Sequence, residues 1–329
     1  MTPAASDKIP IARSYFSCER VNTSTFLITE DDKFDEHPFI YVKVFSNPSL
    51  IVLSDSGCGG RDGVTLRDFI ETHPLEVNGG KPLNPRRDDG SPSLKYLIIC
   101  THCHYDHILG IPSFQDVSPV ILACSAGRSF IEEDIEKHSL CIYLNVPTPK
   151  YEVSYWADDL EDVVFSELPL SLQILATPGH TPDELAWYDA VERHLYVGDT
   201  FYERVARDRS YEQAIIHPGD GNLIDYMHTM DKLIDFVKEK DSHGDGAKVK
   251  VSCGHITTSV DGLEIVFAVK QYFLDILEGK VPVKESEEVR GELFDLWQED
   301  GDPRFSLRVP RRLVSDARKH FRVGPPSGA

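Results

Sequence analysis

The sequence predicts a layered α/β protein, and three observations support this prediction. Segments with the apolar patterns of strands alternate with segments of helical spacing, and this alternation occurs in two halves of the chain. Several predicted strands end in a histidine or an aspartate, as if the chain returned repeatedly to one edge of its sheets. The length of 329 residues, with 41% hydrophobic residues, allows a substantial core.

The first half of the chain reads mainly as strands. Apolar and β-branched runs predict strands at 23–30, 39–45 and 50–57, a helix at 64–73, and a strand at 94–102 that is apolar on both faces. The intervening residues 76–93 are rich in glycine, proline and aspartate, which predicts a loop.

The second half repeats the alternation. We expect strands at 119–126, 172–180 and 247–255, a hairpin at 184–200 with its turn near Asp189 to Arg193, and helices at 125–138 and 219–240. Ser125 is a plausible N-cap for the helix at 125–138. The last seventy residues are expected to be mostly helical, with a basic tail. The helix at 263–277 has an apolar face that packs either on its own domain or on a second copy in a homodimer.

Composition and charge narrow the class of partner. The net charge of −20 disfavours nucleic acids, because a nucleic-acid binder needs a basic face. No apolar run is long enough to cross a membrane, and the N-terminus lacks an apolar segment of signal-peptide length. The seven cysteines are scattered, which suggests reduced thiols and a cytoplasmic protein. Because the acidic charge disfavours nucleic acids, we expect a small-molecule substrate.

The densest cluster of metal-ligating residue types is "THCHYDH" at 101–107. His102 and His104 are two residues apart, so in an extended segment they face the same ion, and the following turn directs Asp106 and His107 to another side. Four further motifs follow predicted strands: "DSG" at Asp55, "TPGH" at His180, "GDT" at Asp199 and "CGH" at His255. Imidazole and carboxylate groups are the ligands that zinc prefers.

The number of donors predicts two zinc ions per chain. His102, His104 and His180 supply three nitrogen ligands for one ion. Asp106, His107 and His255 supply three ligands for the other. Asp199 is the natural bridge, because its carboxylate has two oxygens. A pair of ions of this kind activates a bridging water for hydrolysis.

These motifs, in this order, resemble the metallo-β-lactamase superfamily. The resemblance runs from about Ser24 to His255 and implies a four-layer αββα sandwich with the metal site at one edge of two packed sheets. It implies zinc ligation by His102, His104, Asp106, His107, His180, Asp199 and His255, and a role for Asp55 in orienting a metal-binding histidine. We therefore expect a catalytic domain over residues 1–279, with 280–329 as a helical, basic C-terminal extension of the same domain.

The residue types within this resemblance favour a particular reaction. Common zinc β-lactamases have a cysteine where this chain has Asp199, and the aspartate resembles lactonases, thioester hydrolases and phosphodiesterases. Tyr202 lies where related lactonases carry a tyrosine that contacts the substrate carbonyl, and the alternative is an ordinary core tyrosine in "DTFYE". The sequence thus predicts opening of a small lactone or lactam by a hydroxide that bridges the metals, with Asp106 relaying its proton. Taken as a whole, the chain resembles lactamase-like fungal proteins that act on lactams and lactones such as benzoxazolinones.

Three alternatives remain open from the sequence. A hydroxyacyl-glutathione-type thioesterase would have nearly the same metal site. An iron-dependent oxidative enzyme would keep one ion, and a non-catalytic metal-binding protein would not hydrolyse anything. The aromatic residues of 141–160, among them Tyr143, suit either a pocket wall or an ordinary packed connection.

Overall fold

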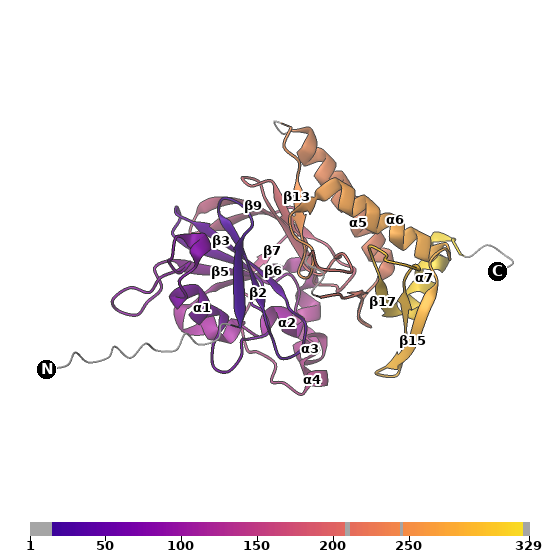
Figure 1. Cartoon of the computed structure of the whole chain (residues 1–329), viewed down its shortest axis with the longest axis horizontal. Coiled ribbons are helices and arrows are strands. Elements are labelled where there is room, and N and C mark those ends of the chain that lie inside the picture. The colour runs from indigo at the N-terminus through magenta and orange to yellow at the C-terminus, as the bar shows by residue number, and fades with distance from the viewer. Residues whose placement is uncertain (1–14, 208–210, 244–245, 325–329) are drawn as a thin grey trace.

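The computed structural model describes residues 15–207, 211–243 and 246–324. It has the predicted fold, in which two sheets pack face to face and helices cover their outer faces (Figure 1). None of the described helices is both long and apolar enough to span a bilayer. The seven cysteines, all of which lie in the described part of the chain, form no disulfide with one another.

The first sheet has the strand order β1-β2-β3-β4-β5-β6-β7. Its strands are β1 (Phe16–Arg20), β2 (Thr25–Glu30), β3 (Phe39–Phe45), β4 (Leu50–Ser54), β5 (Lys95–Ile99), β6 (Val120–Cys124) and β7 (Tyr155–Ala157). Strands β1 to β4 pair antiparallel, and β4 to β7 pair parallel. The carboxyl ends of β4 and β5 therefore lie at the same edge, where Asp55 and His102 follow.

The second sheet has the order β14-β13-β11-β10-β9-β8. Its strands are β8 (Asp162–Phe165), β9 (Leu168–Ala176), β10 (Leu185–Asp189), β11 (His194–Tyr196), β13 (Lys250–Ser252) and β14 (Val260–Asp261). Strands β10 and β11 form the predicted hairpin, with Asp189 paired to His194. The segments after β9, β11 and β13 carry His180, Asp199 and His255.

The prediction of a mostly helical C-terminal extension was wrong. Residues 280–329 contribute β15 (Val283–Val289), β16 (Glu292–Trp297) and β17 (Leu307–Pro310), and β12 (Ile215–Ile216) completes a third sheet in the order β12-β17-β16-β15. Of the described residues in this stretch, only those of α7 (Arg311–Phe321) are helical. Six of the seven residues of β15 are exposed. Its sequence VKESEEV therefore lacks the alternation of apolar and polar residues that predicts a strand.

The remaining helices cover the outer faces of the two main sheets. They are α1 (Leu66–Thr72), α2 (Tyr105–Ile108), α3 (Arg128–His138), α4 (Cys141–Leu144), α5 (Leu223–Ser242) and α6 (Gly262–Leu277), with short 3-10 turns at Glu76–Asn78, Ile111–Val117 and Ser125–Gly127. Thr65 and Asp68 form a capping box that begins α1. Ser125 does not cap α3 as expected. It begins a 3-10 turn, Gly127 is the N-cap of α3, and the Ser125 hydroxyl donates to Asp158.

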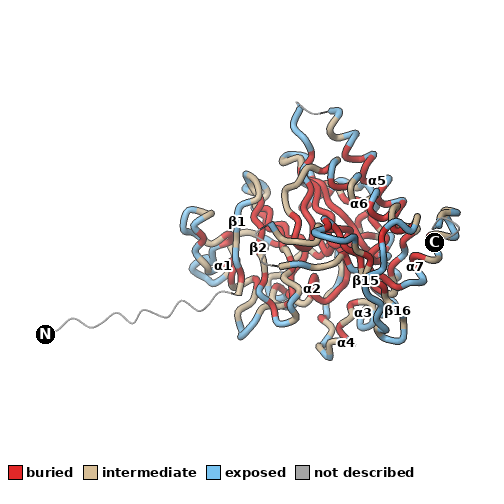
Figure 2. Tube along the Cα trace, turned by 45° about the vertical axis from the view of Figure 1, so that its right-hand side comes forward, coloured by how far each residue is buried: buried red, intermediate tan, exposed pale blue. Residues whose placement is uncertain are grey.

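Three apolar clusters separate the four layers, and the buried backbone runs through the centre of the molecule in Figure 2. One cluster joins the first sheet to α1 and includes Ile51 and Phe69. A second lies between the two sheets and includes Leu97 and Trp187. The third joins the second sheet to α5, α6 and the C-terminal sheet, so α6 packs on its own chain. Because burial of such surfaces favours folding, these clusters hold the sheet edges in register.

Candidate metal centre

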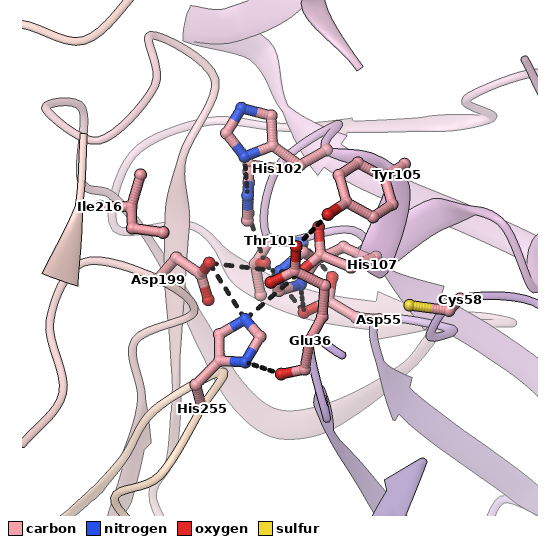
Figure 3. Close-up of polar contacts among 12 residues, drawn as sticks. Glu36, Asp55, Cys58, Thr101, His102, Tyr105, His107, Asp199, Ile216 and His255 are labelled. Carbon is pink, nitrogen blue, oxygen red and sulfur yellow. Dashed lines mark hydrogen bonds and ion pairs between the residues drawn. The ribbon is translucent and has the colours of Figure 1, made fainter. Parts of the chain in front are cut away.

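The seven predicted ligands meet at the edge shared by the two main sheets. They form two groups, which are His102, His104 and His180 in one, and Asp106, His107, Asp199 and His255 in the other. The ligating atoms of each group lie within 4.8 Å of one another, and all seven residues are buried. Loops after strands of both sheets thus deliver the ligands to one place (Figure 3).

The first group consists of three imidazole nitrogens that face one point. Nδ1 of His104 lies 2.9 Å from Nε2 of His102 and 3.1 Å from Nε2 of His180. Ligands at zinc-nitrogen distances in a tetrahedron lie roughly 3.3 Å apart, so this spacing fits a single ion.

The second group is built around two carboxylate oxygens. Oδ2 of Asp106 lies 3.1 Å from Nε2 of His107 and 3.2 Å from Nε2 of His255. Oδ2 of Asp199 lies 3.4 Å from each of the same two nitrogens. Oδ1 of Asp199 is buried without a hydrogen bond among the described residues, and a cation would supply the missing partner.

Outer hydrogen bonds orient three of the histidines through their second ring nitrogen. Nδ1 of His180 donates to the Ile216 carbonyl at 2.7 Å, and Nδ1 of His255 donates to the Glu36 carbonyl at 2.9 Å. Nδ1 of His107 contacts Oδ2 of Asp55 at 2.9 Å. Such contacts orient each ring, so Nε2 is the nitrogen that faces a metal.

Asp55 links the strand ends of β4 and β5. Its Oδ1 accepts a hydrogen bond from the Thr101 amide at 2.8 Å, and its Oδ2 accepts one from the Thr101 hydroxyl at 2.9 Å. The same Oδ2 is the atom that Nδ1 of His107 contacts. Thr101 Oγ1 also lies 3.1 Å from Nδ1 of His102. Asp55 has φ of 66°, a left-handed conformation that turns its side chain back toward these partners. One carboxylate therefore positions ligands of both groups.

The histidines of the first group remain neutral. Burial lowers the pKa of His104 to about 3 and that of His180 to about 4, and it lowers the pKa of His102 well below its usual value. Neutral imidazole is the form that binds a metal.

In the second group, charged neighbours outweigh the effect of burial on the pKa values. Burial alone would raise the pKa of Asp106, but His107 and His255 hold it well below the usual value. Burial alone would lower the pKa of His255, but Asp199 and Asp106 raise it to about 10. In the metal-free chain the carboxylates are ionised and the two imidazoles hold protons, which a bound cation would displace.

Gly254 is required by the close approach of Asp199. A Cβ at this position would lie 2.2 Å from Oδ1 of Asp199, and the Gly254 amide donates to the Gly198 carbonyl at 2.6 Å. The glycine in "CGH" therefore lets the backbone before His255 pass beside the Asp199 carboxylate.

Tyr202 lies beside the second group, with its ring centroid 5.5 Å from that of His255. Its hydroxyl is buried and donates to the Ala214 carbonyl at 2.9 Å. In this arrangement the phenol proton is held by the backbone, and the predicted role at a substrate oxygen stays a prediction.

Sequence reasoning did not find three residues that support the ligands. Thr101 directly precedes His102, and that adjacency was the available signal. Glu36 and Ile216 act through backbone carbonyls, which carry no side-chain signal at all. Glu36 also accepts a hydrogen bond from the Tyr105 hydroxyl (Figure 3).

Comparison with known proteins shows the family to which the chain belongs. Residues 52–242 match the family model of the metallo-beta-lactamase superfamily. The chain belongs to this superfamily. Among its relatives, the putative transcription factor avaE of Aspergillus versicolor is 30% identical over 317 residues, which cover 92% of this chain and 88% of that protein. A hydroxyacylglutathione hydrolase of Saccharophagus degradans is 29% identical over 50% of this chain and 47% of its own length.

Solved structures share the superfamily fold at low identity. The DIM-1 metallo-beta-lactamase aligns with a TM-score of 0.52 and 16% identity over 78% of this chain and 95% of its own. A metallo-beta-lactamase family protein from Thermus thermophilus aligns with a TM-score of 0.51 and 19% identity over 80% of this chain and 84% of its own. These likenesses concern the fold.

Proposed function

We propose that the protein is a hydrolase that holds two zinc ions and opens a small cyclic ester or amide. The observation that supports this proposal is the convergence of two complete donor groups at one buried edge. Two separate groups favour a dinuclear site over the mononuclear site of an iron-dependent oxidative enzyme. The neutral nitrogens of the first group and the ionised carboxylates of the second suit zinc.

Bound zinc would supply Lewis acidity at a carbonyl oxygen and a hydroxide at neutral pH. The protein supplies the remaining functions. His180, His255 and His107 are fixed by Ile216, Glu36 and Asp55, so the ligands keep their positions when a substrate enters. Asp106 turns Oδ2 toward His107 and His255, and we assign to Oδ1 the proton that the attacking water gives up.

Asp199 is proposed to bridge the two groups. Its Oδ2 faces His107 and His255, and its negative charge also raises the proton affinity of His102, His104 and His180 against the effect of burial. A carboxylate that acts on both groups offsets the repulsion between two cations.

A thioesterase of the hydroxyacyl-glutathione type is the second candidate, because two relatives have that name and match 50% and 32% of this chain. The name of the Aspergillus versicolor relative suggests a nucleic-acid partner instead. Against that partner, this chain has a net charge of −20, which opposes binding to the phosphate backbone. We therefore propose a small-molecule substrate.

The test is a hydrolysis screen of the zinc-loaded protein on lactones, lactams, acyl-glutathiones and phosphodiesters, combined with metal analysis. We expect about two zinc ions per chain, since each donor group fits one ion. Lactones or lactams should be the best substrates, whereas preferred hydrolysis of acyl-glutathione would favour the thioesterase. A His104→Ala or Asp106→Asn protein should lose activity, and exposed His228→Ala is the matched control. Full activity in either ligand variant would contradict the proposal.

A further inference from the structure

The loops that carry His180 and His217 are joined by two hydrogen bonds of the same kind. Nδ1 of His180 donates to the Ile216 carbonyl at 2.7 Å, and Nδ1 of His217 donates to the Gly179 carbonyl at 3.2 Å. Each imidazole therefore donates to the carbonyl of the residue that precedes the other imidazole. The two ring centroids lie 5.7 Å apart, at an interplanar angle of 69°. His180 belongs to the first donor group, whereas His217 belongs to neither group.

Packing alone does not explain a histidine at position 217. The side chain is buried and contacts the rings of Tyr226 and Phe273. Its Nε2 has no hydrogen-bond partner among the residues that the structure describes. A buried polar atom without a partner is destabilising, and a phenylalanine ring would avoid that cost. The contribution that phenylalanine could not make is the hydrogen bond from Nδ1 to Gly179.

His217 connects the loop that contains Gly179 to the C-terminal sheet. The amide of His217 donates to the Arg308 carbonyl of β17 at 3.0 Å. The Gly179 carbonyl also accepts the amide of Asn222, the N-cap of α5, at 2.8 Å. The loop lies directly on that helix, because a Cβ on Gly179 would be 2.7 Å from Cα of Tyr226. The side chain of His217 therefore holds a backbone segment that is already in close contact with its neighbours.

We propose, resting on the proposed function, that His217 is a positioning residue for the first zinc site. Its hydrogen bond to Gly179 holds the backbone before His180, while the Ile216 carbonyl holds the ring of His180. The ligand is thus fixed at its backbone and at its ring, and its Nε2 stays 3.1 Å from Nδ1 of His104. Ligands that are already in position lose less freedom when they bind, which increases the affinity for the ion.

Two substitutions separate the hydrogen bond of His217 from the packing of its ring. His217→Phe keeps an aromatic ring but removes the Nδ1 donor. His217→Asn removes the ring but keeps a donor, because the amide nitrogen of asparagine corresponds in position to Nδ1. In chelator competition on the full-length protein, we expect His217→Phe to bind one of two zinc equivalents about tenfold more weakly. We expect His217→Asn to stay close to the wild-type affinity, although it should be less stable in urea.

Cobalt loading and a matched control distinguish a positioning role from a purely structural one. The visible spectrum of bound Co²⁺ reports the ligand geometry, so it should change in His217→Phe and stay unchanged in His217→Asn. His194→Phe is the matched control, because His194 is also buried and its ring contacts the Ser252 hydroxyl at 2.7 Å. It should lower stability without changing zinc affinity. His217→Gln places its amide nearer the position of Nε2, so it also loses the donor and serves if His217→Phe does not fold.

Wild-type zinc affinity in His217→Phe, or a larger loss in His217→Asn than in His217→Phe, would overturn the inference. Nuclear magnetic resonance of the metal-free protein with ¹⁵N-labelled histidine separates the inference from the proposed function. The Nδ1 proton of His180 should exchange slowly with water in the wild-type protein and faster in His217→Phe. If the wild-type protein binds no zinc but shows this difference, His217 positions His180 and the proposed function fails. An unchanged exchange rate in His217→Phe would count against the inference and leave the proposed function intact.

Discussion

Nδ1 of His107 lies 2.9 Å from Oδ2 of Asp55, a carboxylate that also accepts the amide and the hydroxyl of Thr101. This relationship connects the end of β4 to the metal ligands that follow β5. The charge on Asp55 fixes the tautomer of His107 and increases the basicity of its other nitrogen.

Replacing Asp55 by asparagine should weaken binding of zinc to the second group by about 10- to 100-fold, since an amide lacks the charge that orients His107. Competition titrations with a chelator would measure this loss for one of two zinc equivalents. Asp88→Asn changes an exposed aspartate of the 76–93 loop and is the control. Unchanged affinity for both equivalents in Asp55→Asn would show that Asp55 does not position the ligand.

Gly254→Ala should remove the second metal while leaving the fold intact. The added Cβ would lie 2.2 Å from Oδ1 of Asp199, so the carboxylate must move away from His107 and His255. We expect about one zinc ion per chain by elemental analysis, since a donor group that loses its geometry no longer fits an ion. Gly324→Ala, at a position with no atom within 4 Å of the new Cβ, is the matched control. Two tightly bound ions in the Gly254 variant would refute this account.

Tyr202→Phe distinguishes a structural role from a catalytic one. Since the hydroxyl donates to the Ala214 carbonyl, we expect a loss of about 1 kcal/mol in the free energy of unfolding. We expect kcat to fall by less than about tenfold, whereas loss of an oxyanion donor costs about 100- to 1,000-fold. A fall in that larger range would establish the role that the sequence suggested for Tyr202.

Breaking the buried ion pair of Lys43 and Asp189 should destabilise the protein strongly. Nζ of Lys43 lies 2.5 Å from Oδ2 of Asp189, and the two side chains expose 3% and 0% of their surface. Lys43→Met leaves a buried carboxylate without its partner, which should lower the free energy of unfolding by about 3–5 kcal/mol in urea titrations. The double variant Lys43→Met/Asp189→Leu should recover part of that loss. A double variant less stable than Lys43→Met alone would contradict this expectation.

His194 should make stability depend on pH. Burial lowers its pKa from 6.5 to about 3, so between these values the unfolded chain binds a proton that the folded chain does not. Stability therefore falls as the pH decreases from 6.5 toward 3, by up to about 1.4 kcal/mol per pH unit from this residue. His194→Gln should reduce that slope in urea titrations at several pH values. His228→Gln, a change of an exposed histidine, is the matched control. A wild-type slope in His194→Gln would show that His194 is not the source of this pH dependence.

The two main sheets could be predicted because their strands are buried and apolar. The parallel strands β4 and β5 have continuous apolar sequences, and the hairpin of β10 and β11 has a clear turn. The C-terminal sheet could not be predicted in this way. Asp295 of β16 is buried where an apolar residue is expected, because Arg311 and Ser286 satisfy its oxygens. A pattern of apolar residues cannot show a strand whose buried face is held by an ion pair.

The ligand types and their spacing located the residues that the structure brings together, but not the contacts that hold them. His102 and His104 could be paired from a spacing of two in one segment. The supports of His180 and His255 are backbone carbonyls from segments far away in the sequence, Ile216 and Glu36, and only tertiary structure brings them close.

Strand β12, whose Ile216 carbonyl holds His180, pairs with β17 alone among the described strands, and the amides of Ile215 and His217 donate to Ser306 and Arg308. A ligand encoded in the first two thirds of this chain thus depends on backbone from its last tenth. Proteolytic clipping before β17 would therefore release the strand whose backbone holds His180. Under the proposed function, cleaved molecules would lose activity, and hydrolysis would report whether the carboxyl-terminal sheet is intact.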